Sequence, residues 1–291
     1  MSWDRKPSWS DPRVPFAAIL AVYVALGITV LGFNRSPGQV AITVAACCVL
    51  DMALHYLLRG RRLLFPLSAL ISGLSLAILV NYAHGPWLPL VPVVFTIGSK
   101  YLVTFAGRHV FNPTLFGVVI CLRLGDGMFS AAPAYQWGGS AAMAAFVVTA
   151  ALVLFVFRIG RNALIVSFLG FYFLELCVRA WITRWHVPPE TLLLGTVTSA
   201  SFYLFTFFMI TDPATSPASP RAQVGMAAAI VAADLAMHLV ESLSTLFYAG
   251  FLYFTGRYVW LHARSAAWPS PARLATLGAL SAACWLGSHR T

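Results

Sequence analysis

Charged residues are scarce in this sequence. Only 10% of its 291 residues are Asp, Glu, Lys or Arg, whereas 59% are hydrophobic and the mean hydropathy is +0.80. A soluble globular domain carries about 25% charged residues, so the composition excludes that class and predicts an all-α polytopic membrane protein. Acidic residues are fewer than basic ones, with nine Asp and Glu against 19 Lys and Arg. No basic stripe lies outside short loops, so the excess of basic residues favours contact with membrane lipid over binding of nucleic acid.

Several enzyme signatures are also absent. The sequence has no GxGxxG or Walker pattern and no CxxC pair, so nicotinamide and iron–sulphur chemistry would have to come from partner subunits. Its five cysteines lie in apolar runs without metal or redox spacing, which indicates small buried hydrophobic residues. No hydrolase or transferase arrangement stands out.

Long apolar runs are abundant. Runs of about 20 residues indicate transmembrane helices, and together with two shorter runs they predict about ten or eleven. Most arginines next to these runs fall on one side, which predicts a multi-pass membrane protein with a cytoplasmic N-terminus. The predicted helices are 15–33, 39–58, 63–83, 88–106, 139–157, 162–182, 190–210, 222–240 and 242–262, with shorter ones at 112–123 and 274–287.

The order of these helices predicts two inverted halves. The second helix ends with Asp51 and His55, and the helix that would match it in the other half ends with Glu175 and Arg179. Each has an acid followed by a base four residues later. A ligand would then lie between the halves, near broken helices. The predicted boundaries are a cytoplasmic tail 1–14, a first repeat 15–123, an external loop 124–138, a second repeat 139–265, and a C-terminal short helix and tail 266–291.

The most informative stretch is 202–221, where an apolar helix stops at Thr211-Asp212-Pro213. Prolines at 213, 217 and 220 forbid a continuous helix. Ser219 before Pro220 is typical of a helix start, so a new helix is expected to begin between Pro217 and Arg221. Irregular backbone at membrane depth persists only when it is buried in protein or lines a cavity. We therefore expect ligand contacts here, from Thr211, Asp212, Thr215 and Ser216, with Asp212 either capping the new helix or binding a polar ligand edge.

A second polar segment precedes the run 112–123. Asn112-Pro113 is typical of a helix start whose first amides, with Thr114, can face a polar ligand. Positively charged side chains nearby favour binding of an anion at this helix N-terminus. The pattern is equally compatible with a simple N-cap beside ordinary basic residues at the membrane surface. The cations are Lys100, Arg108 and His109.

These two segments carry a family resemblance. RHVFNPTLFG (108–117) and FFMITDPATSP (207–217), with SALISGLSLAILV (68–80), resemble the NqrB/RnfD family, the membrane subunits B and D of sodium-pumping NADH:quinone reductase and of Rnf complexes. The sequence around GRHVFNP is similar to that of stand-alone UnbU-like members of enediyne biosynthesis clusters. The resemblance, which covers most of 60–265, implies an electron-transfer subunit with two inverted five-helix halves, a fold shared with urea and ammonium channels. It also implies bound flavin and redox partner subunits.

One departure from that family bears on the cofactor. Flavinylated members carry Ser/Thr-Gly-Ala-Thr in the external loop, and its threonine takes FMN through a phosphoester. Residues 124–140 contain no threonine, and Ser130 and Ser140 lack the Gly-Ala context. Covalent FMN is therefore not expected, and FMN or riboflavin, or a quinone, would bind non-covalently.

Ionisable residues inside predicted helices form a third group of candidates. Each costs roughly 2.5–3.5 kcal/mol at mid-bilayer, so such residues usually face the protein interior. Pairs at i,i+4 share one helix face, which favours either an ion or proton path or, near helix ends, simple mutual neutralisation. The path candidates are Asp51, His55, Asp234 and His238, and Glu175 with Arg179 forms a similar pair.

Two functions fit these patterns. The first is a membrane subunit of an Rnf/NQR-like electron transport system that binds flavin or quinone, at most one part of an oxidoreductase or translocase. The alternative is a non-redox transporter or channel for a small molecule on the same fold, which the missing threonine favours.

Overall fold

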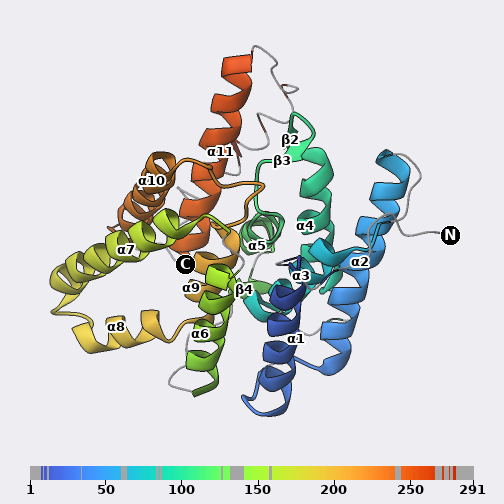
Figure 1. Cartoon of the computed structure of the whole chain (residues 1–291). Coiled ribbons are helices and arrows are strands. Elements are labelled where there is room, and N and C mark those ends of the chain that lie inside the picture. Colours follow the sequence, from blue (N-terminus) through green and yellow to red (C-terminus); the bar gives the residue numbers. More distant parts are fainter. Residues whose placement is uncertain are drawn as a thin grey trace.

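The computed structural model describes residues 8, 10–11, 13–33, 35–59, 64–82, 85, 87–125, 127–131, 141–156, 159–239 and 244–265, together with positions 271, 275, 278 and 279. The described chain is mostly helical (Figure 1). Its elements are α1 (Arg13–Thr29), α2 (Pro37–Leu58), α3 (Leu67–Leu79), β1 (Val80–Tyr82), α4 (Leu90–Leu102), β2 (Thr104–Phe105), β3 (Arg108–His109), α5 (Pro113–Leu124), β4 (Phe129–Ala131), α6 (Ala141–Val156), α7 (Asn162–Thr183), α8 (Pro189–Val197), α9 (Ala200–Leu204), the π-helical turn η2 (Phe205–Met209), α10 (Pro220–Leu239) and α11 (Thr245–Ser265).

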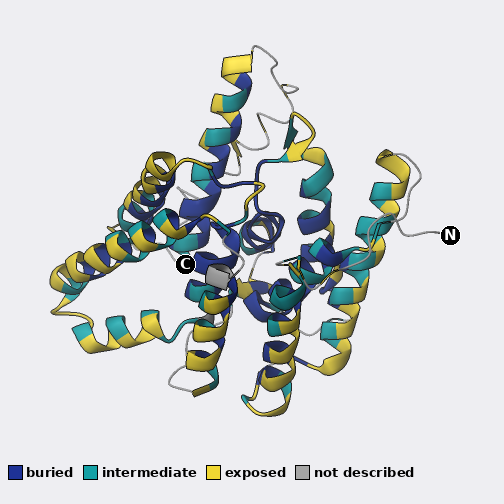
Figure 2. Cartoon of the chain, in the orientation of Figure 1, coloured by how far each residue is buried: buried dark blue, intermediate teal, exposed yellow. Residues whose placement is uncertain are grey.

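Three of the described helices, α2, α7 and α10, are long and apolar enough to cross a membrane. Their outward faces carry large apolar side chains, among them Leu57 on α2 and Val166 and Trp181 on α7. Figure 2 shows these outer helices exposed along one side, with the buried residues gathered toward the centre. Contiguous exposed apolar faces of this kind suit lipid rather than water. The structure thus agrees with a mostly helical membrane protein.

Two short helices form the centre of the molecule. Ten of the 13 residues of α3 are buried, as are the first nine of the 12 residues of α5. At 1.5 Å per residue each is roughly 20 Å long, shorter than a hydrocarbon core of about 30 Å. Helix α5 lies among α3, α4 and α11 and is seen end-on near the middle of Figure 1. Both are therefore interior helices that the outer ones enclose.

Short strands explain why these helices end early. The runs 63–83 and 88–106 predict full-length helices, but α3 ends at Leu79 and α4 at Leu102. Strand β1 then pairs antiparallel with β4, with Val80 opposite Ala131, and β2 pairs with β3, with Thr104 opposite His109. The ladders satisfy backbone groups that would otherwise be buried without partners, so hydropathy alone predicted helices that were too long.

The predicted helix 190–210 is not continuous. Helix α8 ends at Val197, and the chain bends by 53° before Ser201–Met209. The hydroxyl of Thr198 donates back to the Leu194 carbonyl, and the hydroxyl of Ser199 accepts from the Phe202 amide as a new N-cap. Adjacent hydroxyls offer the backbone bonds outside the helical ladder, which accounts for the break. The π-helical turn that follows keeps the backbone irregular up to Thr211.

Other predictions about the chain have mixed outcomes. The helix restart is confirmed, because α10 begins at Pro220 and Ser219 accepts a hydrogen bond from the Ala222 amide. Cys177 is exposed on α7, contrary to the expectation of buried cysteines. Most of the predicted helix 274–287 and most of the loop 124–138 lie outside the described residues. The two-repeat division of the chain stays a prediction.

Helix α5 is held against α4 by a close approach at Gly117. A Cβ atom at this position would lie 1.9 Å from the Thr96 hydroxyl oxygen and 2.9 Å from the Pro92 carbonyl oxygen. Only glycine allows the two backbones to come this near, as small residues do between membrane helices. The contact fixes where the N-terminus of α5 points.

Candidate functional site

A cavity of about 460 Å³ lies between α3, the N-terminus of α5 and the segment 204–214. Its volume falls within the range of about 300–1,000 Å³ that is usual for small-molecule sites. One wall is apolar and contains Phe16, Ile71 and Phe208. The structure therefore brings the two polar segments singled out in the sequence to one place, hereafter the main cavity.

The N-terminus of α5 contributes the most distinctive polar groups. Asn112 is the N-cap and accepts a hydrogen bond at Oδ1 from the Leu115 amide over 3.2 Å, as its sequence context predicts. Its side-chain nitrogen, the Thr114 hydroxyl and the Ser75 hydroxyl on α3 make no hydrogen bond within the described part of the chain. All three residues are buried and line the main cavity. Buried polar groups normally have partners, so these three are available to a ligand.

Asp212 closes a turn on the opposite wall. Its Oδ1 accepts from the Ala214 amide over 2.9 Å, and its carbonyl accepts from the amides of Thr215 and Ser216. The expectation that Asp212 caps the restarting helix is wrong, because α10 begins only at Pro220. Its second oxygen, Oδ2, lies 3.6 Å from Nε2 of His109 and links the two cavity walls.

Thr211 also lines the main cavity, whereas Thr215 and Ser216 do not. The Thr211 hydroxyl donates to the Phe207 carbonyl. Ser216 is buried and accepts a hydrogen bond from Nε of Arg161 over 2.6 Å. Burial lowers the pKa of Arg161, and the charge of Asp212 opposes that shift. Ser216 therefore holds the turn in place from behind and does not line the main cavity.

Gln223 completes this support and was not singled out in the sequence. The side chain is 1% exposed and its Oε1 accepts from the Leu164 amide over 3.2 Å. Its Nε2 lies 3.0 Å from the Gly160 carbonyl oxygen and 3.2 Å from those of Pro217 and Ala218. One glutamine thus ties the segment before α10 to the start of α7. A polar residue three positions after a helix-starting proline was the only signal for it.

A second cavity of about 250 Å³ shares Arg13, Ser68 and His109 with the main one. Lys100 lines it, with Nζ 2.7 Å from Oδ1 of Asp51 and 2.9 Å from the Ser68 hydroxyl. Asp51 thus pairs with a lysine on another helix, so the predicted neutralisation by His55 is wrong; His55 only lines the cavity.

Of the three cations expected around the N-terminus of α5, only one lines the main cavity. Lys100 is held by Asp51, and Arg108 is exposed on β3 and lines neither cavity. His109 does line the main cavity, and so does Arg13, which the sequence analysis did not select. Arg13 donates two hydrogen bonds from Nε and one from Nη2 to Asp11 and thereby lowers the pKa of that carboxyl. Because both signs of charge are present, the cavity does not favour a strongly anionic ligand.

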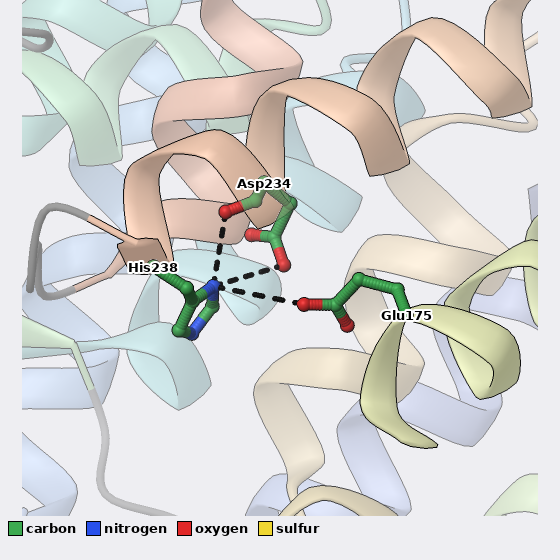
Figure 3. Close-up of side chains that lie close together, drawn as sticks. All are labelled: Glu175, Asp234 and His238. Carbon is green, nitrogen blue, oxygen red and sulfur yellow. Dashed lines mark hydrogen bonds and ion pairs between the residues drawn. The ribbon is translucent and has the colours of Figure 1, made fainter. Parts of the chain in front are cut away.

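A third group of polar side chains lies apart, between α7 and α10 (Figure 3). The predicted pairs are confirmed: Nε of Arg179 lies 2.8 Å from Oε1 of Glu175, and Nδ1 of His238 lies 3.3 Å from Oδ2 of Asp234. The same His238 nitrogen is 4.0 Å from Glu175, so the two pairs form one cluster. Ligand-type atoms of Glu175, Asp234 and His238 lie within 4.8 Å of one another. The contact between the two pairs joins different helices, so the spacing within either helix did not predict it.

Comparison of the sequence with protein-family models gives no match, and comparison with curated proteins gives none. The likeness to the NqrB/RnfD family therefore rests on the quoted motifs alone. The motif residues Asn112, Thr114, Thr211 and Asp212 do share one cavity, which is the structural observation relevant to that likeness.

Proposed function

We propose that this chain is a membrane subunit of an NqrB/RnfD-like electron transport system that holds a flavin or a quinone non-covalently in the main cavity. The observation that carries the proposal is the set of polar groups of Asn112, Thr114 and Ser75, which have no hydrogen-bond partner among the described residues and face an apolar wall. A planar ring with polar edges matches such a site, because its faces need apolar contact and its edges need hydrogen bonds.

The chain's own residues supply binding and orientation. The Thr114 hydroxyl and the Asn112 amide nitrogen can donate to carbonyl oxygens at a ring edge, while Phe208 and Ile71 exclude water from the ring face. His109 and Asp212, 3.6 Å apart, close the cavity on its polar side. Flavin or quinone, when bound, supplies the electron-accepting chemistry, and redox partner subunits supply the electrons. FMN or riboflavin both suit this role, since no contact requires the phosphate.

The proposal extends to architecture and location. Two inverted halves are supported by α2 and α7, which each present an acid to a nitrogen-bearing side chain on a later helix: Asp51 to Lys100 on α4, and Glu175 to His238 on α10. Charge asymmetry in the sequence supports a bacterial cytoplasmic membrane location with the N-terminus inside.

A specific observation favours a second candidate, a non-redox transporter or channel. The end of the broken stretch 189–209, with Leu204, Phe208 and Met209, lines the main cavity together with the two short interior helices. Discontinuous helices of this kind form substrate sites in secondary transporters. Such a protein would bind a small polar-edged molecule without a chromophore.

Detergent-purified protein, incubated in turn with FMN, riboflavin and a water-soluble quinone and then desalted, separates the two candidates. Retained flavin is read from the visible absorption spectrum, and quinone binding from quenching of tryptophan fluorescence. Thr114→Val is expected to weaken binding roughly three- to tenfold, the equivalent of one lost hydrogen bond. The matched control is Thr149→Val, an exposed threonine on α6 whose hydroxyl donates only to the Ala145 carbonyl. Wild-type protein that binds neither flavin nor quinone would overturn the redox proposal and leave the transporter.

A further inference from the structure

The cluster between α7 and α10 carries an unbalanced charge. Glu175 is 3% exposed and Asp234 is 0% exposed, and none of their four carboxylate oxygens accepts a hydrogen bond within the described part of the chain. One guanidinium, that of Arg179, belongs to the cluster and forms an ion pair with Glu175. With His238 neutral, one negative charge is left over in a buried position, which is costly unless another positive charge joins it.

Arg179 also determines the state of His238. A guanidinium nitrogen can only donate a hydrogen bond, and Nη1 of Arg179 contacts Nε2 of His238. That ring nitrogen must therefore present its lone pair, so the proton of a neutral imidazole sits on Nδ1. From there it donates to the Asp234 carbonyl over 3.0 Å. A doubly protonated His238 would place an N–H against the guanidinium, so the extra positive charge does not reside on the histidine.

The same geometry disfavours a metal ion among Glu175, Asp234 and His238. A histidine that binds a metal normally donates its other ring N–H to an acceptor, whereas here Nε2 faces a donor. The Nδ1 atom that lies among the carboxylates carries a hydrogen and has no lone pair to offer. Arg179 already occupies one side of Glu175 at 2.8 Å. A sodium ion would likewise meet the Nδ1 hydrogen and the guanidinium.

We propose that Glu175 and Asp234 together bind one exchangeable proton, and that Arg179 and His238 are positioning residues for this pair. Uptake of the proton from water converts one carboxylate to a carboxylic acid and removes the surplus charge, and release restores it. The site is separate from the main cavity and does not depend on a bound flavin or quinone.

The surroundings give this site a route to one surface. His238 lies in the last turn of α10, and 28% of its side chain is exposed, so the carboxylates are buried behind it. The groups that face the pair within the described residues are Tyr172 and Arg179 on α7, His238 on α10 and the Thr245 hydroxyl on α11. That hydroxyl lies 3.1 Å from Nδ1 of His238 and adds a polar step at the exposed side.

Infrared spectroscopy of the full chain in lipid vesicles tests the proposal, because a carboxylic acid has a C=O stretch that a carboxylate lacks. The chain has only nine acidic side chains, and one such band is expected at neutral pH in the wild type, shifted in D₂O. Either Glu175→Gln or Asp234→Asn is expected to abolish it, because the cluster then holds one carboxylate and one guanidinium and has no surplus negative charge. The matched control, Glu190→Gln at the exposed start of α8, is expected to retain it.

If a variant fails to fold, measurements of the carboxylic acid band on the wild type alone still test the proposal. Replacing choline chloride by sodium chloride, or adding zinc, is expected to leave the band unchanged. Loss of the band on adding either metal would show a metal site and overturn the proposal. So would absence of the band in the wild type at neutral pH, or its persistence in Glu175→Gln, which would place the proton on Asp234 alone.

Discussion

Replacing Gln223 by leucine is expected to lower the free energy of unfolding by about 2–4 kcal/mol. Leucine has a similar volume, so the apolar contacts stay, but the Leu164 amide loses its acceptor and the carbonyls of Gly160, Pro217 and Ala218 lose their donor. The two N–H groups of a glutamine can serve two of those carbonyls at a time. Each buried polar group left without a partner costs about 1–3 kcal/mol, and because Nη1 of Arg161 still donates to the Gly160 carbonyl, the sum stays within the stated range.

Unfolding in mixed micelles of a mild detergent and SDS, followed by tryptophan fluorescence, measures this change. The control is Gln39→Leu in the first turn of α2, a partly exposed glutamine that accepts one hydrogen bond from the Ser36 amide over 3.0 Å. Its loss is expected to cost less than about 1 kcal/mol. Equal losses in the two variants would refute the reasoning, because they would show that the four contacts of Gln223 contribute no more than one exposed cap.

Three further predictions concern orientation, cofactor attachment and Asp212. In a background without the exposed Cys177, a membrane-impermeant thiol reagent is expected to label a cysteine at Gly127 and to spare one at Arg59; the reverse pattern would contradict the proposed topology. Any bound flavin is expected to leave on SDS denaturation, since 124–140 has no threonine, and a fluorescent band at the protein's mass in a denaturing gel would show otherwise. Asp212→Asn keeps an acceptor for the Ala214 amide, so stability measured in the same micelles is expected to change by less than about 0.5 kcal/mol, while flavin retention after desalting falls; unchanged retention would leave Asp212 as a turn residue only.

The sequence predicted the site best where structure is set within one turn. Asn112 before Pro113 and Ser219 before Pro220 begin helices in the structure as their local chemistry indicates. The break at Thr211 was visible because prolines forbid a helix regardless of what surrounds them. That both segments line one cavity followed from the idea that irregular backbone in a membrane protein needs protein or a cavity around it.

Contacts between distant segments were not predictable in the same way. Hydropathy cannot distinguish an apolar strand from an apolar helix, so the β1–β4 pairing at Val80 was missed. The i,i+4 rule found Glu175 with Arg179 but is silent about a neighbouring helix, so the approach of His238 was missed. The ion pair of Lys100 with Asp51 was missed for the same reason, because Asp51 lies on another helix.

The short interior helices constrain how the protein is made. A nascent α5 of 12 residues extends roughly 18 Å and cannot remain across a bilayer by itself. It becomes stable only with α4 beside it at Gly117, and with α11, which is synthesised more than 120 residues later. Until α11 arrives, Phe111 and Phe116 lack their ring contacts with Phe251. The packing around α5 is therefore complete only after the end of the chain's last long described helix has been synthesised.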